Sequence, residues 1–508
     1  MKNSSQQINE SQEYLAALDI GSNSFHFVLA RKLGDHLQVV HTEKYRVQLA
    51  QGLNSESILD QSAIERGLSI LAHLATTTRH IHPENFRAVA TFTLRKAKNV
   101  ATFLTAAKKV FPFEIEIISG HEEARLIYQG VAHHRENNEQ QLIIDIGGGS
   151  TECIIGEREN TLALESLNIG CVSYQQRFFP TGEITSTAFK DAIHSAKHQI
   201  DTMSKRFKTI GWQQVIGTSG TIKTITKIIN FDNNIKKAVT LTELIALKKR
   251  LLQFKHQQYI KIAGLKENRQ TVICSGVAIL IALLECLEIR QISFCKYALR
   301  EGVLFEQLAN SPRNNVRANT INGFVERFNI DKQHAKSVSD LADKIFNAVK
   351  ATWQLTDAIY SELLHAAISL HEIGMNINAS GYQKHGQYIL EQTDLAGFNQ
   401  EQQKALAWLV GNQRNKISPL IAKQWHLLAK SKLEKLCFII RLSVLLNQQR
   451  HGDEHGIIAI DNEKNTLIIT LNTQWLLARP IIDTELFYEQ KMVKKLACRL
   501  KIQTTDVN

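Results

Sequence analysis

The chain has 508 residues, of which 44% are hydrophobic and 21% are charged, as expected of a globular protein with about three or four domains. Its 7 cysteines include no CxxC pair, which argues against a disulfide framework and a cysteine-based zinc site and favours a reducing compartment. The net charge of +11 favours a polyanionic partner, yet no finger, basic zipper helix or RNA-binding signature singles out nucleic acid.

The first expected element is a strand, a polar turn and a second strand within residues 14–32. The turn offers the carboxylate of Asp19, one glycine, and the side chains of Ser22, Asn23 and Ser24. These groups could hold a phosphate. A hairpin turn rich in Asn, Gly and Ser is also common for structural reasons alone, so this turn does not by itself establish a phosphate site.

A helix over residues 63–81 and a strand over residues 87–94 follow. Arg95 comes directly after this strand, where its guanidinium could fork onto phosphate oxygens. A surface salt bridge explains this arginine equally well.

Two adjacent glutamates start the next helix, in "SGHEEARLIYQG" at residues 119–130. Ser119 and Glu122 have the spacing of a capping box, and Glu122 can also pair with Arg125 in the next turn. Glu123 has no such structural role. It lies beside apolar positions, where partial desolvation would raise its pKa and make it a better base. Spacing alone leaves its catalytic role open.

Residues 141–157 repeat the plan of the first segment, because "IDIGGGS" echoes "LDIGSNS" with Asp-Ile-Gly and a final Ser at equal spacing. This predicts two similar half-domains that face each other, with two unrelated turns as the alternative. Successive glycines let backbone N–H groups wrap an anion, and two hydroxyls follow them. The phosphate-binding candidates are Gly147, Gly148, Gly149, Ser150 and Thr151. Asp145 would repel a phosphate, so we expect Mg²⁺ between the two.

A third glycine-containing turn, "GTSGT", lies between an expected strand and helix. The N–H groups at such a helix N-terminus form a weak anion-site candidate with Gly217, Ser219 and Gly220. The apolar run at residues 272–284 is too short to span a bilayer and predicts a buried helix. Beyond it, residues 309–452 show almost only helical periodicity, and residues 453–508 read as strand, strand and a helix over residues 483–500.

Six motifs together resemble, in order and spacing, the exopolyphosphatase / guanosine pentaphosphate phosphatase family, over nearly the whole chain. They are "LDIGSNSFHFVLAR", "ATFTLRKAKN", "IEIISGHEEARLIYQGV", "LIIDIGGGSTE", "GTSGTIK" and "YALREGVLFE". The resemblance implies an α/β fold of two ribonuclease-H-like halves of the acetate kinase/Hsp70/actin type, at residues 1–130 and 131–308, with the site in their cleft. It also implies Glu123 as the catalytic base, Arg95 as a phosphate ligand and magnesium near Asp19, Asp145 and Glu152.

Residues 309–452 resemble an HD-type helical domain, and residues 453–508 are expected to form a small α+β domain. His334, His371, Glu372 and His385 sit where HD-type domains place metal ligands. However, Glu372 replaces the aspartate of the His-Asp pair, and Asn447 stands where a final aspartate would be expected. We therefore expect a metal-poor relic that helps to bind substrate.

Two activities compete within the family. "IDIGGGSTE", "GCVSY", "NINASG" and "GFNQEQQ" look like long-chain exopolyphosphatases, whereas "VATFTLR" and "IYQGVAH" look like the guanosine pentaphosphate enzyme. We expect an exopolyphosphatase that releases terminal orthophosphate from inorganic polyphosphate. The alternatives are a guanosine pentaphosphate (pppGpp) phosphatase, a non-hydrolytic binder of guanosine tetra- or pentaphosphate, and an ATP-dependent kinase of the same fold.

The remaining expectations concern partners and location. A homodimer is a family-level expectation, and no nucleic-acid partner is expected. The polar N-terminus and the scattered cysteines lead us to expect a cytoplasmic protein. Peripheral contact with the inner face of the membrane through basic surface stays open.

Overall fold

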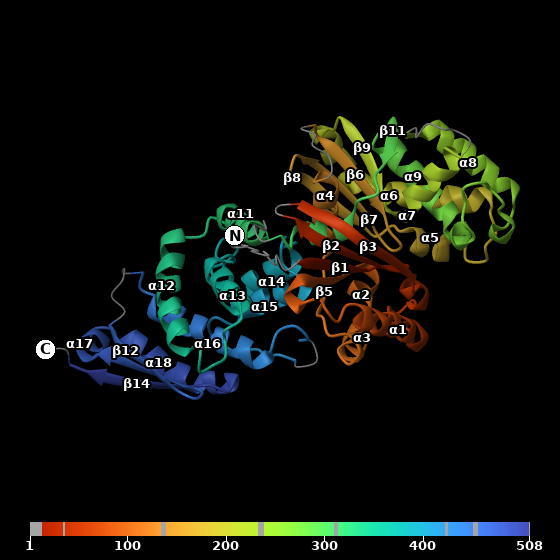
Figure 1. Cartoon of the computed structure of the whole chain (residues 1–508). Helices are drawn as coiled ribbons and strands as arrows, with labels where there is room; N and C mark the ends of the chain where they lie inside the picture. Colours follow the sequence, from red (N-terminus) through yellow and green to blue (C-terminus); the bar gives the residue numbers. More distant parts are fainter. Residues whose placement is uncertain are drawn as a thin grey trace, which may run out of the picture. The chain divides into compact units, whose positions relative to one another are not determined.

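The computed structural model describes residues 13–33, 36–133, 139–231, 238–308, 313–421, 425–450 and 456–506. The chain divides into two compact units, Met1–Pro312 and Arg313–Asn508 (Figure 1). The expected division after residue 130 falls inside a helix. The expected division at 308/309 adjoins residues outside the described ranges, and the expected division at 452/453 lies within such residues.

The first unit begins with a five-stranded sheet in the order β3-β2-β1-β4-β5. β1 pairs antiparallel with β2 and parallel with β4. The strands are β1 (Tyr14–Ile20), β2 (Ser24–Leu33), β3 (His36–Arg46), β4 (Phe86–Ala90) and β5 (Ile115–Ile117).

The second sheet of this unit has the order β10-β11-β9-β6-β7-β8. β6 pairs antiparallel with β7 and parallel with β9, as β1 does with β2 and β4. This repeat of the strand plan confirms the predicted mixed α/β duplication. The strands are β6 (Gln141–Ile146), β7 (Thr151–Glu157), β8 (Asn160–Leu167), β9 (Gln214–Thr218), β10 (Val239–Thr240) and β11 (Gln291–Phe294).

The strand expected over residues 87–94 is shorter than predicted. β4 ends at Ala90, because its partner β5 ends opposite, at Ile117. The Arg95 N–H then donates to the Thr91 carbonyl at 3.0 Å, so the chain turns into a short helix. The helices of this half are α1 (Gln61–Thr77), α2 (Phe92–Lys96), α3 (Val100–Ala107) and α4 (Gly120–Ala132).

β1 is buried on both faces, as alternation along a strand allows. Leu18 and Ile20 join a core with α1 and α3. Ala17 joins a second core that also contains Leu126 of α4 and Ile143 of β6. This second core links the two sheets through α4, and thereby fixes the helix that carries the two adjacent glutamates.

The second half of the unit contains a long apolar helix, α9, whose residues Val272 to Leu284 are all buried, as predicted. Among described residues, one segment, Glu267–Cys286, is long and apolar enough by length and composition to cross a membrane, and 72% of its most apolar window is buried inside the protein. The helices of this half are α5 (Cys171–Phe178), α6 (Ser186–Ile210), α7 (Ser219–Ile229), α8 (Leu241–Gln253), α9 (Gln270–Cys286) and α10 (Leu299–Phe305).

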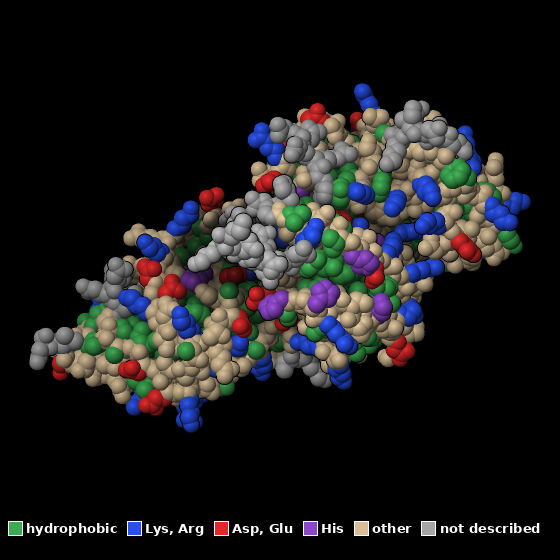
Figure 2. Space-filling model, viewed as in Figure 1, with side chains coloured by type: hydrophobic (Ala, Val, Ile, Leu, Met, Phe, Trp, Pro, Cys, Tyr) green, Lys and Arg blue, Asp and Glu red, His purple; other side chains and the backbone are tan. Residues whose placement is uncertain are grey.

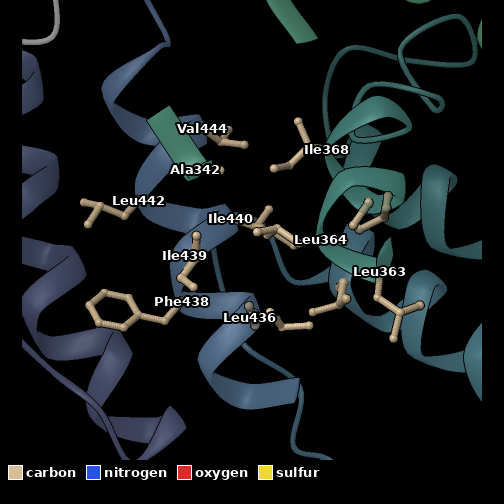
Figure 3. Packing of buried hydrophobic residues seen from close by; sticks show 14 of the residues in the cluster. Ala342, Leu363, Leu364, Ile368, Leu436, Phe438, Ile439, Ile440, Leu442 and Val444 are labelled. Atoms are coloured by element: carbon tan, nitrogen blue, oxygen red, sulfur yellow. The ribbon is translucent and has the colours of Figure 1, made fainter. Parts of the chain in front are cut away.

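The second unit is mainly helical around a single core. In Figure 3 the side chains of α16, such as Leu436 and Ile440, face Leu363 and Leu364 of α13. The helices are α11 (Arg313–Arg327), α12 (Lys332–Val349), α13 (Ala358–Ser369), α14 (Tyr382–Gln392), α15 (Gln400–Gly411) and α16 (Lys430–Leu446).

The end of the chain adds a three-stranded sheet, β12-β13-β14, that shares this core. The helix expected over residues 483–500 is wrong in its second half. It ends at Met492, and Ala497 adopts a left-handed φ of 54° that closes a short turn. Residues 499–505 then pair with β13 as a parallel strand. The elements are β12 (Ile457–Glu463), β13 (Thr466–Asn472), α17 (Thr473–Leu477), α18 (Pro480–Met492) and β14 (Arg499–Thr505).

Candidate active site

A cavity of about 390 Å³ opens in the first unit between elements of its two halves. The polar turn after β1 and the glycine-rich turn after β6 both line it, as do Glu123 of α4 and the first residues of α7 and α10. The predicted residues that line the cavity are Asp19, Ser22, Asn23, Ser24, Glu123, Asp145, Gly147, Gly148, Gly149, Ser150, Ser219 and Gly220.

The two turns contact each other closely. A Cβ added to Gly148 would lie 2.9 Å from Cβ of Ser22, and one added to Gly149 would overlap the Phe92 ring at 2.0 Å. Gly148 and Gly149 therefore serve close packing, and no glycine of this turn has a positive φ. The Gly147 N–H donates to the Ser150 carbonyl at 2.9 Å, which closes the turn.

Two carboxylates occupy equivalent positions in the two halves. Asp19 lies near the end of β1 and Asp145 near the end of β6. Burial raises the pKa of Asp19 to about 8, and nearby Glu123 adds to the shift. Burial raises the pKa of Asp145 to about 7, against a hydrogen bond from Thr218 Oγ1 to Asp145 Oδ2 at 2.5 Å. Buried carboxylates on one cavity are the hard oxygen donors that suit a magnesium ion.

Glu123 lies in the first turn of α4. The helix starts as predicted, since the Ser119 hydroxyl accepts a hydrogen bond from the Glu122 N–H at 3.1 Å. The Glu123 side chain is 8% exposed. Burial raises the pKa of Glu123, and Arg95 opposes that shift. Glu123 thus combines a desolvated carboxylate with access to the cavity, which is what a general base needs.

Arg95 contacts the glutamate, and it is not among the residues that line the cavity. Its Nη1 donates to Glu123 Oε2 at 3.1 Å and to the Ile118 carbonyl at 3.0 Å. Both side chains are mostly buried, so the pair is no surface salt bridge. In this geometry Arg95 positions the carboxylate of Glu123.

Glu122 and Arg125 belong to a buried ionic network. Arg125 donates two hydrogen bonds to Glu122, at 2.8 and 2.7 Å, and also pairs with Glu306 just after α10. Glu306 in turn accepts from Arg87 of β4 at 2.6 Å. The network includes the carboxylate of Glu122 and ties α4 to α10, and the capping-box bond from the Glu122 side chain to the Ser119 N–H stays a prediction.

α4 and α10 also cross at two glycines. A Cβ on Gly130 would lie 2.1 Å from the Ala298 carbonyl oxygen, and one on Gly302 would lie 1.9 Å from the Leu126 carbonyl oxygen. Only glycine permits this approach of two helix backbones.

Three other predicted residues lie outside the cavity lining. The Thr151 hydroxyl donates to the Ile169 carbonyl. Glu152 is 1% exposed, pairs in register with Asp145 and accepts a hydrogen bond from Ser166 at 2.8 Å. Gly217 packs its backbone against the side chain of Ile222. Their assigned roles in phosphate or metal binding stay predictions.

Sequence reasoning missed the cations of the cavity, which are Lys44, Lys223, Arg269, Lys296 and Arg300. Lys223 and Arg300 stand inside the motifs "GTSGTIK" and "YALREGVLFE", so those motifs held a usable signal. Burial and nearby Arg269 lower the pKa of Lys44 to about 8. On the outer surface drawn in Figure 2, Lys and Arg are spread over the first unit instead of forming one block.

Family models match both units of the chain. A model described as the Ppx/GppA phosphatase family matches residues 28–311, and one described as Ppx/GppA phosphatase, domain III, matches residues 316–490. The chain belongs to the Ppx/GppA phosphatase family.

Similar Ppx/GppA proteins cover almost the whole chain. A protein of Pseudoalteromonas translucida, named guanosine-5'-triphosphate,3'-diphosphate pyrophosphatase, is 36% identical over 97% of this chain and 99% of its own length. A protein of the same name from Photobacterium profundum is 35% identical over 93% and 95%. A solved exopolyphosphatase of Cytophaga hutchinsonii shares the fold, with a TM-score of 0.53 at 24% identity over 59% of this chain and 99% of that one.

These relatives overturn the expectation that the chain is foremost an exopolyphosphatase. They carry the name of the guanosine pentaphosphate enzyme, which was the alternative. The error has a physical reason. Both activities cleave a terminal phosphoanhydride, so the phosphate-holding motifs of Ppx/GppA proteins serve either substrate and do not discriminate between them.

Proposed function

We propose that this Ppx/GppA phosphatase hydrolyses guanosine 5'-triphosphate 3'-diphosphate at the end of its 5' chain and releases orthophosphate. The observation that carries the proposal is the buried Glu123 carboxylate, which shares one cavity with two phosphate-type turns and five Lys or Arg side chains. Relatives named for that nucleotide support the choice of substrate.

In the proposed reaction the terminal phosphoryl group lies against the backbone N–H groups of residues 148–150 and the side chains of Ser22 and Asn23. Glu123 accepts a proton from a water as the water oxygen bonds to phosphorus. The bond from phosphorus to the bridging oxygen breaks, its electron pair stays with the departing nucleotide, and orthophosphate leaves. Burial raises the pKa of Glu123 and makes it a stronger base, while Arg95 opposes that shift.

The function is tested by offering the purified full chain guanosine pentaphosphate, long polyphosphate and ATP side by side. We expect orthophosphate release to be fastest with guanosine pentaphosphate, and guanosine tetraphosphate to appear as the product by mass spectrometry. Faster turnover of ATP would support the kinase-type alternative. Binding of the nucleotide without any product would support the non-hydrolytic alternative.

Asp19 and Asp145 would hold a Mg²⁺ ion, which when bound would neutralise phosphate charge. We expect removal of divalent cations with EDTA to abolish phosphate release and added Mg²⁺ to restore it. EDTA saturated beforehand with Mg²⁺ serves as the control for the chelator itself. Undiminished release after exhaustive treatment with free EDTA would contradict a metal-assisted reaction.

The 3'-diphosphate of the substrate is a second anionic group and needs cations of its own. Lys223 and Arg269 line the cavity from the second half. The Arg269 guanidinium packs against Gly220, since a Cβ added to Gly220 would lie 2.2 Å from Arg269 Nη2. We propose that this pair contacts the 3'-diphosphate. Arg269→Ala should raise KM for guanosine pentaphosphate by about 10-fold or more, because a hydrogen bond to a charged group contributes about 1.5–3 kcal/mol.

Two comparisons make this test specific. GTP lacks the 3'-diphosphate, so its inhibition constant should stay unchanged in Arg269→Ala. Arg250, an exposed arginine in the last turn of α8, provides a matched Arg250→Ala control. Equal weakening of GTP and guanosine pentaphosphate would assign Arg269 to the 5' chain instead.

A further inference from the structure

Two histidines and a glutamate come together in the second unit. His334 lies in the first turn of α12, and His371 and Glu372 follow α13. All three are buried, and one possible ligand atom from each lies within 4.8 Å of the others. The two imidazole rings have centroids 5.3 Å apart. The active-site cavity uses none of these residues.

His371 has one ring nitrogen without a hydrogen-bond partner among the described residues. Its side chain is fully buried, and Nδ1 lies 2.6 Å from the Ile368 carbonyl oxygen. A carbonyl can only accept, so Nδ1 carries the proton and Nε2 carries a lone pair. Within the described part of the chain, Nε2 has no hydrogen-bond partner. A ring nitrogen fixed in this way by a backbone carbonyl is the usual arrangement of a metal-ligating histidine.

His334 offers a second nitrogen. It is 7% exposed, and its buried Nδ1 has no hydrogen-bond partner among the described residues. Its Nε2 lies 3.8 Å from Glu372 Oε1. His334 therefore places one ring nitrogen near the carboxylate of Glu372 and leaves the other without a hydrogen-bond partner among the described residues.

Glu372 supplies the negative charge of the cluster. Arg450 pairs with it and with Asp331 at 2.8 Å, and the Arg450 side chain is 42% exposed. Burial raises the pKa of Glu372, and Arg450 opposes that shift. Because Arg450 reaches the cluster from the surface, it can move away from Glu372 without any change in the core.

We propose that His334, His371 and Glu372 bind a divalent transition-metal ion of the zinc class. Two imidazole nitrogens select such ions over Mg²⁺ and Ca²⁺. Ligands of tetrahedral zinc lie about 3.4 Å apart, so ligand atoms that now lie within 4.8 Å of one another need to close by at most about 1.4 Å. Three protein ligands leave a fourth position open, as in sites where the ion also binds water or a substrate.

This inference differs from the metal-poor relic that the sequence led us to expect. Two of the positions compared with HD-type domains do not contribute. Asn447 donates to the Ser443 carbonyl at 2.8 Å, and His385 on α14 is not part of the cluster. The remaining three residues nevertheless retain the geometry of a site.

The test is Co²⁺ and Zn²⁺ binding by the full chain after EDTA treatment, in excess Mg²⁺ so that the carboxylates of the active-site cavity are occupied. We expect one ion per chain by calorimetry, with visible Co²⁺ absorption bands typical of nitrogen ligation. His334→Gln should weaken binding by more than about tenfold, since changes even outside the ligand shell cost about 10–100-fold. His365→Gln is the matched control, because His365 is a half-exposed histidine on α13 that pairs with Asp343 at 2.9 Å.

A second variant tests the site without touching a ligand. Arg450→Ala removes the cation that competes for Glu372, so it should tighten Co²⁺ binding. Thermal unfolding of each metal-free variant checks that the second unit is folded. Absence of a bound ion in the folded wild-type chain, or equal affinity of wild type and His334→Gln, would overturn the proposal.

Discussion

Replacing Glu123 by Gln is expected to lower kcat for phosphate release by about 10²–10⁴-fold, because a positioned general base contributes that much. Gln keeps the size of the side chain and can still accept the hydrogen bond from Arg95 that now reaches Glu123 Oε2 at 3.1 Å. It cannot take a proton from water. KM for guanosine pentaphosphate should therefore change little. The measurement is steady-state orthophosphate release over a range of substrate concentrations.

The control is the same substitution at a glutamate away from the cavity. Glu157 lies exposed at the end of β7, so Glu157→Gln should leave kcat unchanged. Nucleotide binding by Glu123→Gln, measured by calorimetry, should persist and show that the cavity is intact. A kcat within twofold of wild type would remove Glu123 from the proposed reaction.

Replacing Arg125 by Met should lower the free energy of unfolding of the first unit by about 3–5 kcal/mol, because it removes a cation that two buried carboxylates share. Glu122 is 1% exposed and loses the two hydrogen bonds from Arg125, and Glu306 loses its ion pair with Arg125. The measurement is the free energy of unfolding in urea, taken from the transition that belongs to the first unit.

Arg206→Met is the matched control. Arg206 pairs with Glu165 at 2.8 Å, with side-chain exposures of 54% and 28%, and exposed pairs contribute about 1 kcal/mol or less. Equal losses in the two variants would mean that the network around Arg125 does not stabilise α4.

Features that are local in the sequence could be predicted well. The turns at Asp19 and Asp145 were recognisable because each follows an apolar strand and repeats the same residues. The N-terminus of α4 was recognisable from Ser119 and Glu122. The resemblance, and not the spacing, indicated Glu123.

Features that depend on distant residues could not be predicted. Lys44 and Arg269 reach the cavity from β3 and from the residue before α9, and nothing in their own neighbourhoods marks them. The end of β4 at Ala90 depends on the length of β5. The strand at residues 499–505 requires β13 as its partner. Without knowledge of that pairing, the helical pattern of α18 was extended into these residues.

The ionic network has a consequence for how the protein is made. Arg125 lies 181 residues ahead of its partner Glu306. At about 5–20 residues per second, a ribosome needs roughly 10–40 s to synthesise the segment between them. During that time the strands of the first sheet are complete, whereas α4 lacks both the glycine crossing with α10 and the counter-charge of Glu306. In the nascent chain, the helix that carries Glu123 therefore gains these two contacts only after α10 has been made.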